Sequence, residues 1–302
     1  MIQYQNKSWL SLILRWKGTV APGIMLRSLL AAGVGVGAEF MWRDQHWALP
    51  PVAHGLVGVA LGLLLVFRTN ASYDRFWEGR KLVGLMVNRS RDLLRQVTTL
   101  LEGDDDAARA DRAELLRLVN LLFALIRQYL RKERDLTRLG PLVTEAERAA
   151  LAEVPVRPAV AFTWISARLT AAVRAGRLTE QRLMLMDANL TSFSDSWGGA
   201  ERIMKTPLPF AYAHHIRVFL TLFVFTAPFA MAQPMAWATP VTAFVLAYAL
   251  FGIDEIGVEI EDPFGYDAND LPLDATGDTI AADTAAIART RSQESLRKTG
   301  GP

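Results

Sequence analysis

Charged residues are distributed very unevenly along the chain. Residues 218–253 form a run of 36 without Asp, Glu, Lys or Arg, and residues 45–67 form a second run of 23. The hydrocarbon core of a bilayer is about 30 Å thick, and roughly 20 apolar helical residues cross it. Isolated strands cannot satisfy their backbone groups in lipid, and no alternating strand of convincing length occurs here. The pattern therefore predicts an all-α membrane protein.

Four transmembrane helices are predicted. The first covers about residues 25–41 and the second about residues 51–67. The 36-residue block is long enough for two crossings and has prolines in its middle, so we expect a helical hairpin of residues 212–229 and 235–256. The short loops that join helix 1 to helix 2 and helix 3 to helix 4 contain few Lys or Arg, whereas the opposite ends of the helices are rich in them. Basic residues favour the cytoplasmic side of a membrane, so both termini are expected in the cytoplasm.

About 140 residues of another character separate the second and third predicted crossings. In residues 82–101, 107–130 and 178–197, apolar residues recur at steps of three and four among charged ones, which is typical of amphipathic helices. Three acids at 104–106 stand where an N-cap and a first helical turn belong. The predicted organisation is a cytosolic N-terminal segment (1–24), transmembrane helices 1 and 2 (25–67), a helical cytosolic domain (68–211), transmembrane helices 3 and 4 (212–256) and a cytosolic C-terminal segment and tail (257–302).

Composition excludes several classes of function. The 302 residues include 33 Lys and Arg, 31 Asp and Glu and no Cys, so thiol catalysis, disulfides and thiolate metal sites are absent. A net charge of +2 gives no reason to expect nucleic acid as a partner. No Ser-His-Asp order and no phosphate-binding loop stands out. We therefore expect that the protein is not an enzyme.

One stripe of the second predicted crossing is bulky and apolar. Val59, Leu63 and Phe67 are spaced four residues apart, which puts their side chains on one side of a helix. Packing against other helices is the usual role of such a stripe. The helix is expected to continue beyond the membrane into residues 68–81, a dense mixture of charged, amide and aromatic residues.

Three sequence motifs stand out: FRTNASYDRFWEGR at 67–80, TPLPFAY at 206–212 and EDPFG at 261–265. They resemble motifs of bacterial members of the bestrophin family. They stand in the right order at matching intervals, so the resemblance covers nearly the whole chain. The family motif residues are Arg68, Asn70, Tyr73, Arg75, Pro207 and Pro209.

The resemblance implies a homopentameric channel in the bacterial inner membrane, whose partners are the lipid bilayer and permeating monovalent ions. It places the pore neck at Val59, Leu63 and Phe67 and a cytosolic aperture at Leu208. Five copies of an apolar stripe around an axis form a hydrophobic constriction, which gates by dewetting and has little ionic preference of its own. A passive bestrophin-like ion channel is the expected function.

The sign of the permeating ion is left open. The family is best known for chloride and other anions, and the basic motif at 68–81 fits that preference. Residues 218–288, however, contain ten acids and no Lys or Arg. If Asp254, Glu255 and Glu259 face a cytosolic vestibule, they would favour a sodium-type cation channel; otherwise they pair with arginines of the cytosolic domain. A membrane-anchored scaffold or receptor is the alternative from another class.

The resemblance also raises the question of calcium. Asp267 and Asp270 match the place where animal bestrophins hold calcium with two carboxylates. Calcium takes six to eight oxygen ligands, and non-acidic residues at 268, 269, 271 and 272 dilute the acidic run here. We expect that no cofactor is required, that no calcium is ordered between Asp267 and Asp270, and that currents do not need micromolar calcium.

Overall fold

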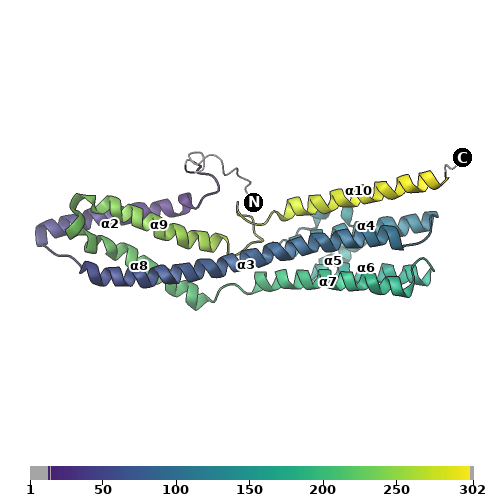
Figure 1. Cartoon of the computed structure of the whole chain (residues 1–302), viewed down its shortest axis with the longest axis horizontal. Helices are drawn as coiled ribbons and strands as arrows, with labels where there is room; N and C mark the ends of the chain where they lie inside the picture. The colour runs from purple at the N-terminus through teal and green to yellow at the C-terminus, as the bar shows by residue number, and fades with distance from the viewer. Residues whose placement is uncertain (1–12, 14, 300–302) are drawn as a thin grey trace. The chain divides into compact units, whose positions relative to one another are not determined.

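The computed structural model describes residue 13 and residues 15–299, with side chains up to Thr290, and this part of the chain contains helices and no strand. The all-α prediction is thus confirmed for the described residues, while the expectations for residues 1–12 and for the last three residues of the tail lie outside them. The elements are α2 (Ala21–Gln45), α3 (Pro51–Leu100), α4 (Asp106–Leu130), η1 (Leu136–Leu142), α5 (Glu145–Ala152), α6 (Arg157–Arg174), α7 (Glu180–Lys205), α8 (Phe210–Met235), η2 (Ala236–Ala238), α9 (Thr239–Glu259) and α10 (Leu273–Thr299) (Figure 1).

Two predictions about helix ends are confirmed. The helix that starts at Pro51 does continue past the apolar segment, because α3 runs unbroken for 50 residues and includes the amphipathic stretch predicted at 82–101. Helix α4 has Asp105 as its N-cap, and the Asp105 carboxylate accepts the Ala108 N–H at 2.7 Å. This bond satisfies one of the helix's free N–H groups, which is the reason acids are favoured at that position.

The predicted end of the third apolar helix, at residue 229, is wrong. Helix α8 contains Pro228 and Pro234 and ends only at Met235, next to Ala236 at φ 46°. Helices in lipid tolerate proline when other groups bond the freed carbonyls. The carbonyl freed by Pro234 is that of Ala230, four residues back. The neighbouring Phe229 carbonyl accepts the Leu49 N–H at 3.1 Å, a donor from outside the helix.

The chain divides into two compact units. Unit 1 comprises the chain up to Trp77, Thr206–Pro263 and Asp267–Asp270; unit 2 comprises Glu78–Lys205, Phe264–Tyr266 and the chain from Leu271. Among the described residues, three helical stretches are long and apolar enough to cross a membrane: Ala21–Gln45, Pro51–Leu100 and Phe210–Glu259. The third of these contains α8 and α9, separated by η2.

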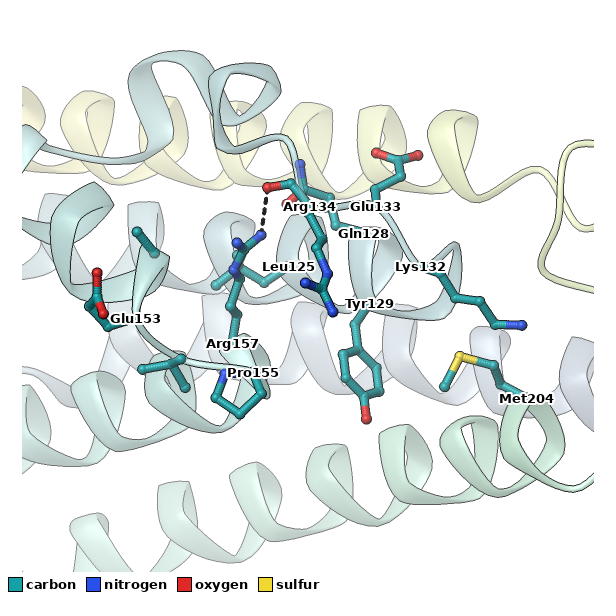
Figure 2. Close-up of a pocket in the computed structure, with 12 residues that line it drawn as sticks. Leu125, Gln128, Tyr129, Lys132, Glu133, Arg134, Glu153, Pro155, Arg157 and Met204 are labelled. Atoms are coloured by element: carbon teal, nitrogen blue, oxygen red, sulfur yellow. Dashed lines mark hydrogen bonds between the residues drawn. The ribbon is translucent and has the colours of Figure 1, made fainter.

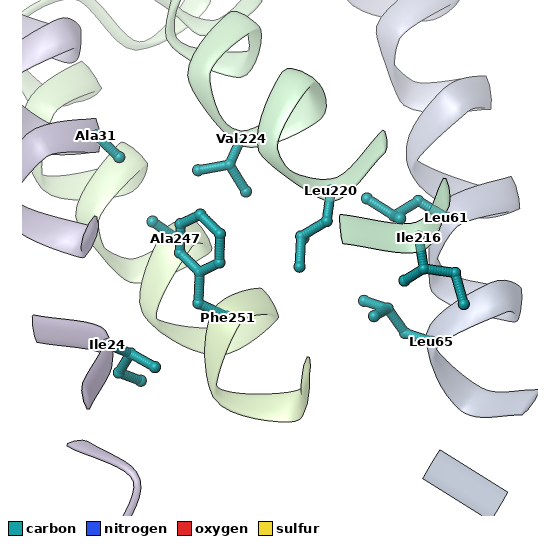
Figure 3. Close-up of a cluster of buried hydrophobic side chains, with 9 residues drawn as sticks. All are labelled: Ile24, Ala31, Leu61, Leu65, Ile216, Leu220, Val224, Ala247 and Phe251. Carbon is teal, nitrogen blue, oxygen red and sulfur yellow. The ribbon is translucent and has the colours of Figure 1, made fainter. Parts of the chain in front are cut away.

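The core of unit 1 is formed by side chains from α2, α3, α8 and α9 (Figure 3). On α3, Leu61 and Leu65 face this core and are 0% and 2% exposed. Because they are four residues apart, they define one buried side of α3. The buried cluster consists of Ile24, Ala31, Leu61, Leu65, Ile216, Leu220, Val224, Ala247 and Phe251.

Helices α2 and α9 approach each other closely at Gly35. A Cβ atom added at Gly35 would lie 2.8 Å from the Cα of Pro240, which is a backbone atom and cannot easily move. We expect Gly35→Val to lower the free energy of unfolding by about 1–3 kcal/mol, the usual cost of overpacking. Gly37→Val is the matched control, since a Cβ at Gly37 meets nothing within 4 Å. Equal losses of thermal stability in detergent for both variants would contradict the close approach.

Unit 2 is a helical bundle in which α4 contacts α6, α7 and α10. An ion cluster attaches α5 to α4: the Arg117 guanidinium lies 2.7 Å from the Glu114 carboxylate and 2.6 Å from that of Glu147. These contacts lower the pKa of Glu114 and raise that of Arg117. Glu147 also closes a capping box with Thr144 at the start of α5. The cluster therefore holds the short helix α5 in place.

Candidate functional site

The apolar stripe of α3 faces away from the core of its own unit. Val59, Leu63 and Phe67 are 66%, 57% and 62% exposed, whereas Leu61 and Leu65 on the opposite side are buried. Large apolar side chains that remain exposed in a single copy of a chain mark a lipid-facing or partner-facing surface. Packing against the chain's own helices, the usual role of such a stripe, is therefore not the role of these three residues.

The same side of α3 becomes polar one turn further on. Asn70 and Asp74 follow Phe67 at steps of three and four, so they continue the stripe, and both are exposed. We had not singled out Asp74 from the sequence, although its spacing from Phe67 is a signal that could have found it. The stripe thus carries three apolar residues followed by an amide and a carboxylate.

Arg68 points to the opposite side and is buried. Its guanidinium pairs with the carboxylate of Asp254 on α9, and the two side chains are 1% and 5% exposed. A second arginine, Arg217 on α8, lies 3.9 Å from the same carboxylate. Asp254 therefore has its counter-charges within unit 1, on the helices that surround it.

The structure brings the three sequence motifs together at Arg75. Its Nε donates to the backbone carbonyl of Glu261 at 3.1 Å, and one of its Nη atoms donates to the carbonyl of Thr206. The Glu261 carboxylate in turn accepts the N–H of Leu208 at 3.0 Å. Residues about 130 and 186 positions apart in the chain are joined by these bonds. The linker before α8 is thereby fixed to the middle of α3 and to the segment that follows α9.

Leu208 itself is only partly exposed, between two exposed prolines, Pro207 and Pro209. Pro209 is the N-cap residue of α8. The next residue, Phe210, is the first residue of α8 and is 81% exposed. A role of Leu208 as the cytosolic aperture stays a prediction, and sequence reasoning did not consider Phe210.

The acids proposed for a vestibule have partners within unit 1. Glu255 pairs with Arg27 of α2 at 3.2 Å. The Glu259 carboxylate accepts a hydrogen bond from the Asn269 amide at 2.9 Å. Asp254 and Glu255 thus form ion pairs with arginines, as the alternative to a charged vestibule expects. These arginines lie on α2, α3 and α8 of unit 1.

Asp267 and Asp270 close a tight turn on each other. The Asp270 carboxylate accepts the Asp267 N–H at 2.8 Å, and the Asp270 N–H donates to the Asp267 carbonyl at 3.0 Å. Among the described residues, no group of three or more His, Cys, Asp or Glu side chains could hold a metal ion. Burial, with the charges of Asp267 and other nearby acids, raises the pKa of Asp270 to about 6. The turn is thus closed by hydrogen bonds within the chain.

A pH dependence follows from the raised pKa of Asp270. Folding raises the pKa of this carboxyl, so its contribution to stability is fully present below the unfolded-state pKa of 3.8. The contribution is lost as the pH rises through the folded-state pKa of about 6. Asp270→Asn keeps an acceptor for the Asp267 N–H and removes the buried charge. We therefore expect it to stabilise the protein increasingly as the pH rises from about 4 to about 7, by on the order of 1–2 kcal/mol. Thermal unfolding across this range checks it; Asp278→Asn, at an exposed position of α10, should show no such trend.

Comparison with known proteins shows similarity over nearly the whole length. The family described as bacterial/fungal bestrophin protein matches residues 1–286. The chain is 36% identical to the voltage-dependent anion channel-forming protein sll1024 of Synechocystis over 275 residues, which cover 91% of this chain and 90% of the relative. It is 34% identical to the voltage-dependent anion channel-forming protein YneE of Escherichia coli K12 over 290 residues, which cover 94% and 92%.

The fold is also similar to solved structures. A bacterial bestrophin homologue from Klebsiella pneumoniae superposes with a TM-score of 0.81 at 28% identity, covering 88% of this chain and 98% of that chain. A structure of the same homologue with a Y211A mutation gives the same TM-score and identity and covers 88% and 99%. The chain therefore shares the fold of that homologue.

Proposed function

The chain belongs to the bacterial and fungal bestrophin family, and from this premise we propose that it assembles as a homopentamer around α3 and passively conducts small monovalent ions. The observation that carries the proposal is the exposed apolar stripe of Val59, Leu63 and Phe67. Around a symmetry axis this stripe forms a neck that gates by dewetting. The curated relatives are named as channel-forming proteins, which agrees with the prediction that this chain is not an enzyme.

The proposed channel lies in the bacterial inner membrane. Helices α2, α3, α8 and α9 supply four crossings, and both termini are cytoplasmic because Lys and Arg flank the ends of these helices away from the short connections. Unit 2 then lies in the cytoplasm. Mass measurement in detergent tests the assembly: monomers or dimers alone would contradict the pentamer.

Anions are the first candidate for the permeating ion, because the relatives are named as anion channel-forming proteins. Purified protein in a planar bilayer with asymmetric potassium chloride tests this, since the reversal potential reports the sign of the ion. A chloride-directed potential is the expected result. The absence of current would favour the membrane-anchored scaffold or receptor. The same recording in the presence of a calcium chelator should show unchanged current, because the Asp267–Asp270 turn is already closed by its own hydrogen bonds.

A cation channel is the second candidate, and Asp74 is the observation that favours it. In a pentamer, five copies of this exposed carboxylate would form a ring directly after the neck. No Lys or Arg stands at the stripe positions 59, 63, 67, 70 and 74 to offset this negative charge. A ring of acids concentrates cations and repels anions. Selectivity in this case depends on Asp74 rather than on the paired acids of α9.

Asp74→Asn is expected to move the reversal potential toward the anion potential, more at low than at high salt. The physical reason is screening, because the Debye length falls from about 10 Å at 0.1 M to about 3 Å at 1 M. Glu145→Gln removes an acid that is 91% exposed on α5 and serves as the control. An unchanged reversal potential for Asp74→Asn at every salt concentration would place this carboxylate off the ion pathway.

A further inference from the structure

A cavity of about 430 Å³ opens in unit 2 where α4 ends (Figure 2). Its wall combines residues from the end of α4 and the segment after it, the end of α5 and the segment that follows it, the start of α6 and the end of α7. This volume is in the range of small-molecule sites, about 300–1,000 Å³. We call it the α4-end cavity; it is lined by Leu125, Gln128, Tyr129, Lys132, Glu133, Arg134, Ala152, Glu153, Val154, Pro155, Arg157 and Met204.

Three cations line the α4-end cavity, and none of them forms an ion pair with a carboxylate of the described residues. Arg157 donates only to backbone carbonyls, those of Leu151 at 3.0 Å and Arg134 at 2.9 Å. Among the described residues, Lys132 and Arg134 form no ion pair either, and the nearby acids Glu133 and Asp135 pair with Arg138 instead. Figure 2 shows the Arg134 side chain extending toward Tyr129. The cavity therefore has positive charge available for a ligand.

Two acids also line the cavity. The Glu133 carboxylate is 12% exposed and lies 3.6 Å from Arg138, outside the set of lining residues. In Figure 2 it points away from the guanidinium groups of Arg134 and Arg157. Glu153 is exposed at the far end of the wall. Beyond the lining residues, the Tyr129 hydroxyl donates to the Glu201 carboxylate, which also pairs with Lys205. The lining itself therefore carries three cations against two acids.

Gln128 supplies an independent observation. This side chain is 1% exposed, and its Nε2 donates to the Asp135 carbonyl at 2.8 Å, but its Oε1 is buried with no hydrogen-bond partner. A buried acceptor without a donor is costly. A ligand with a hydroxyl or amine group would supply the missing donor.

Lys132 is held in a backbone conformation that favours glycine. It follows the last turn of α4 at φ 58°, and its N–H donates to the Tyr129 carbonyl at 3.0 Å. Glycine is the residue that adopts this conformation at no steric cost. A lysine in this conformation lowers the stability of the fold compared with glycine. Residues in such strained conformations cluster at functional sites, where the side chain is needed.

We propose that the α4-end cavity binds an organic phosphate that also carries a hydroxyl or amine donor. The phosphate lies among Lys132, Arg134 and Arg157, because charge-assisted hydrogen bonds from arginine suit phosphate oxygens. The donor group reaches Gln128 Oε1. The organic part contacts the apolar wall of Leu125, Val154, Pro155 and Met204.

Two sources offer this chemistry, a soluble metabolite and the headgroup of an anionic phospholipid. The second is relevant because the apolar helix α8 begins at Phe210, six residues after Met204. Two arms of one experiment separate the sources. In the first, full-length protein in phosphatidylcholine nanodiscs is titrated with radiolabelled glycerol 3-phosphate. In the second, delipidated protein in detergent is mixed with phosphatidylglycerol or phosphatidylcholine, and bound lipid is counted by native mass spectrometry.

We expect saturable binding in at least one arm, and Arg134→Gln should weaken it by about tenfold, the value of one charge-assisted hydrogen bond. Lys132→Gly should weaken binding similarly while the melting temperature stays equal or rises, because glycine relieves the backbone conformation. This combination separates lost ligand contacts from a damaged fold.

Arg174→Gln is the matched control. It removes the same charge at the other end of α6, about 25 Å from Arg157 at 1.5 Å per helical residue. Its binding should equal that of the unmodified protein. The proposal is overturned if neither arm shows saturable binding, or if Arg174→Gln weakens binding as much as Arg134→Gln does.

Discussion

Asp254→Ala is expected to lower the free energy of unfolding by about 3–5 kcal/mol, the usual cost of leaving one partner of a buried ion pair alone. The Arg68 guanidinium that it pairs with is 1% exposed, so water cannot replace the lost carboxylate. Arg217, 3.9 Å from the same carboxylate, would then face Arg68 without an acid between them. Thermal unfolding of the detergent-purified protein measures the loss.

The structure also orders the related variants. Arg68→Met should cost less than Asp254→Ala, because Arg217 remains beside Asp254 as a cation. The double variant Arg68→Met/Asp254→Leu should recover most of the loss, since apolar residues of similar volume often replace buried ion pairs without penalty.

Glu255→Ala is the control for burial. This substitution breaks the ion pair between Glu255 and Arg27, whose side chains are 31% and 51% exposed. Exposed pairs contribute less than about 1 kcal/mol. If Glu255→Ala were as damaging as Asp254→Ala, burial could not be the cause of the larger effect.

The apolar helices could be predicted because the length of an uncharged run is set by bilayer thickness, a property that needs no tertiary information. The end of α8 could not. Pro234 removes the N–H that would bond the Ala230 carbonyl, and no local pattern shows that α8 nevertheless runs on to Met235. The prolines alone indicated an earlier turn.

Helix α6 was missed for a different reason. Its buried side contains Pro158, Ala161, Ile165, Leu169 and Ala172, so only two of its five buried positions carry a large aliphatic side chain and the hydrophobic period is weak. The two prolines at 155 and 158 also favour a loop over a helix in this part of the sequence. Pro158 instead occupies the first turn of α6, where proline is tolerated because that N–H has no helical partner.

The stripe on α3 was predictable from spacing, but its exposure was not. Four-residue steps place Val59, Leu63 and Phe67 on one side, and only the packing of α3 shows that Leu61 and Leu65 take the buried side instead. Arg68 and Asp254 are separated by 186 residues, so no local pattern could pair them.

Phe67→Ala is expected to raise single-channel conductance or open probability severalfold while the reversal potential changes little. In the proposed pentamer the substitution widens five positions of the neck at once and lowers the cost of wetting it. A neck of apolar side chains presents no charge, so its removal leaves ion preference unchanged. Single-channel recording in a planar bilayer gives both quantities from one experiment.

Val57→Ala is the matched control for the neck. Val57 is 38% exposed but lies about 160° around α3 from Val59 and about 120° from Leu63. Its truncation should leave conductance near the unmodified value, because the side chain points away from these two neck residues. A similar rise for Val57→Ala would mean that a loosened helix, and not a widened neck, increases the current. A reversal of anion against cation preference in Phe67→Ala would show that selectivity belongs to the neck itself, since dewetting alone cannot distinguish the sign of an ion.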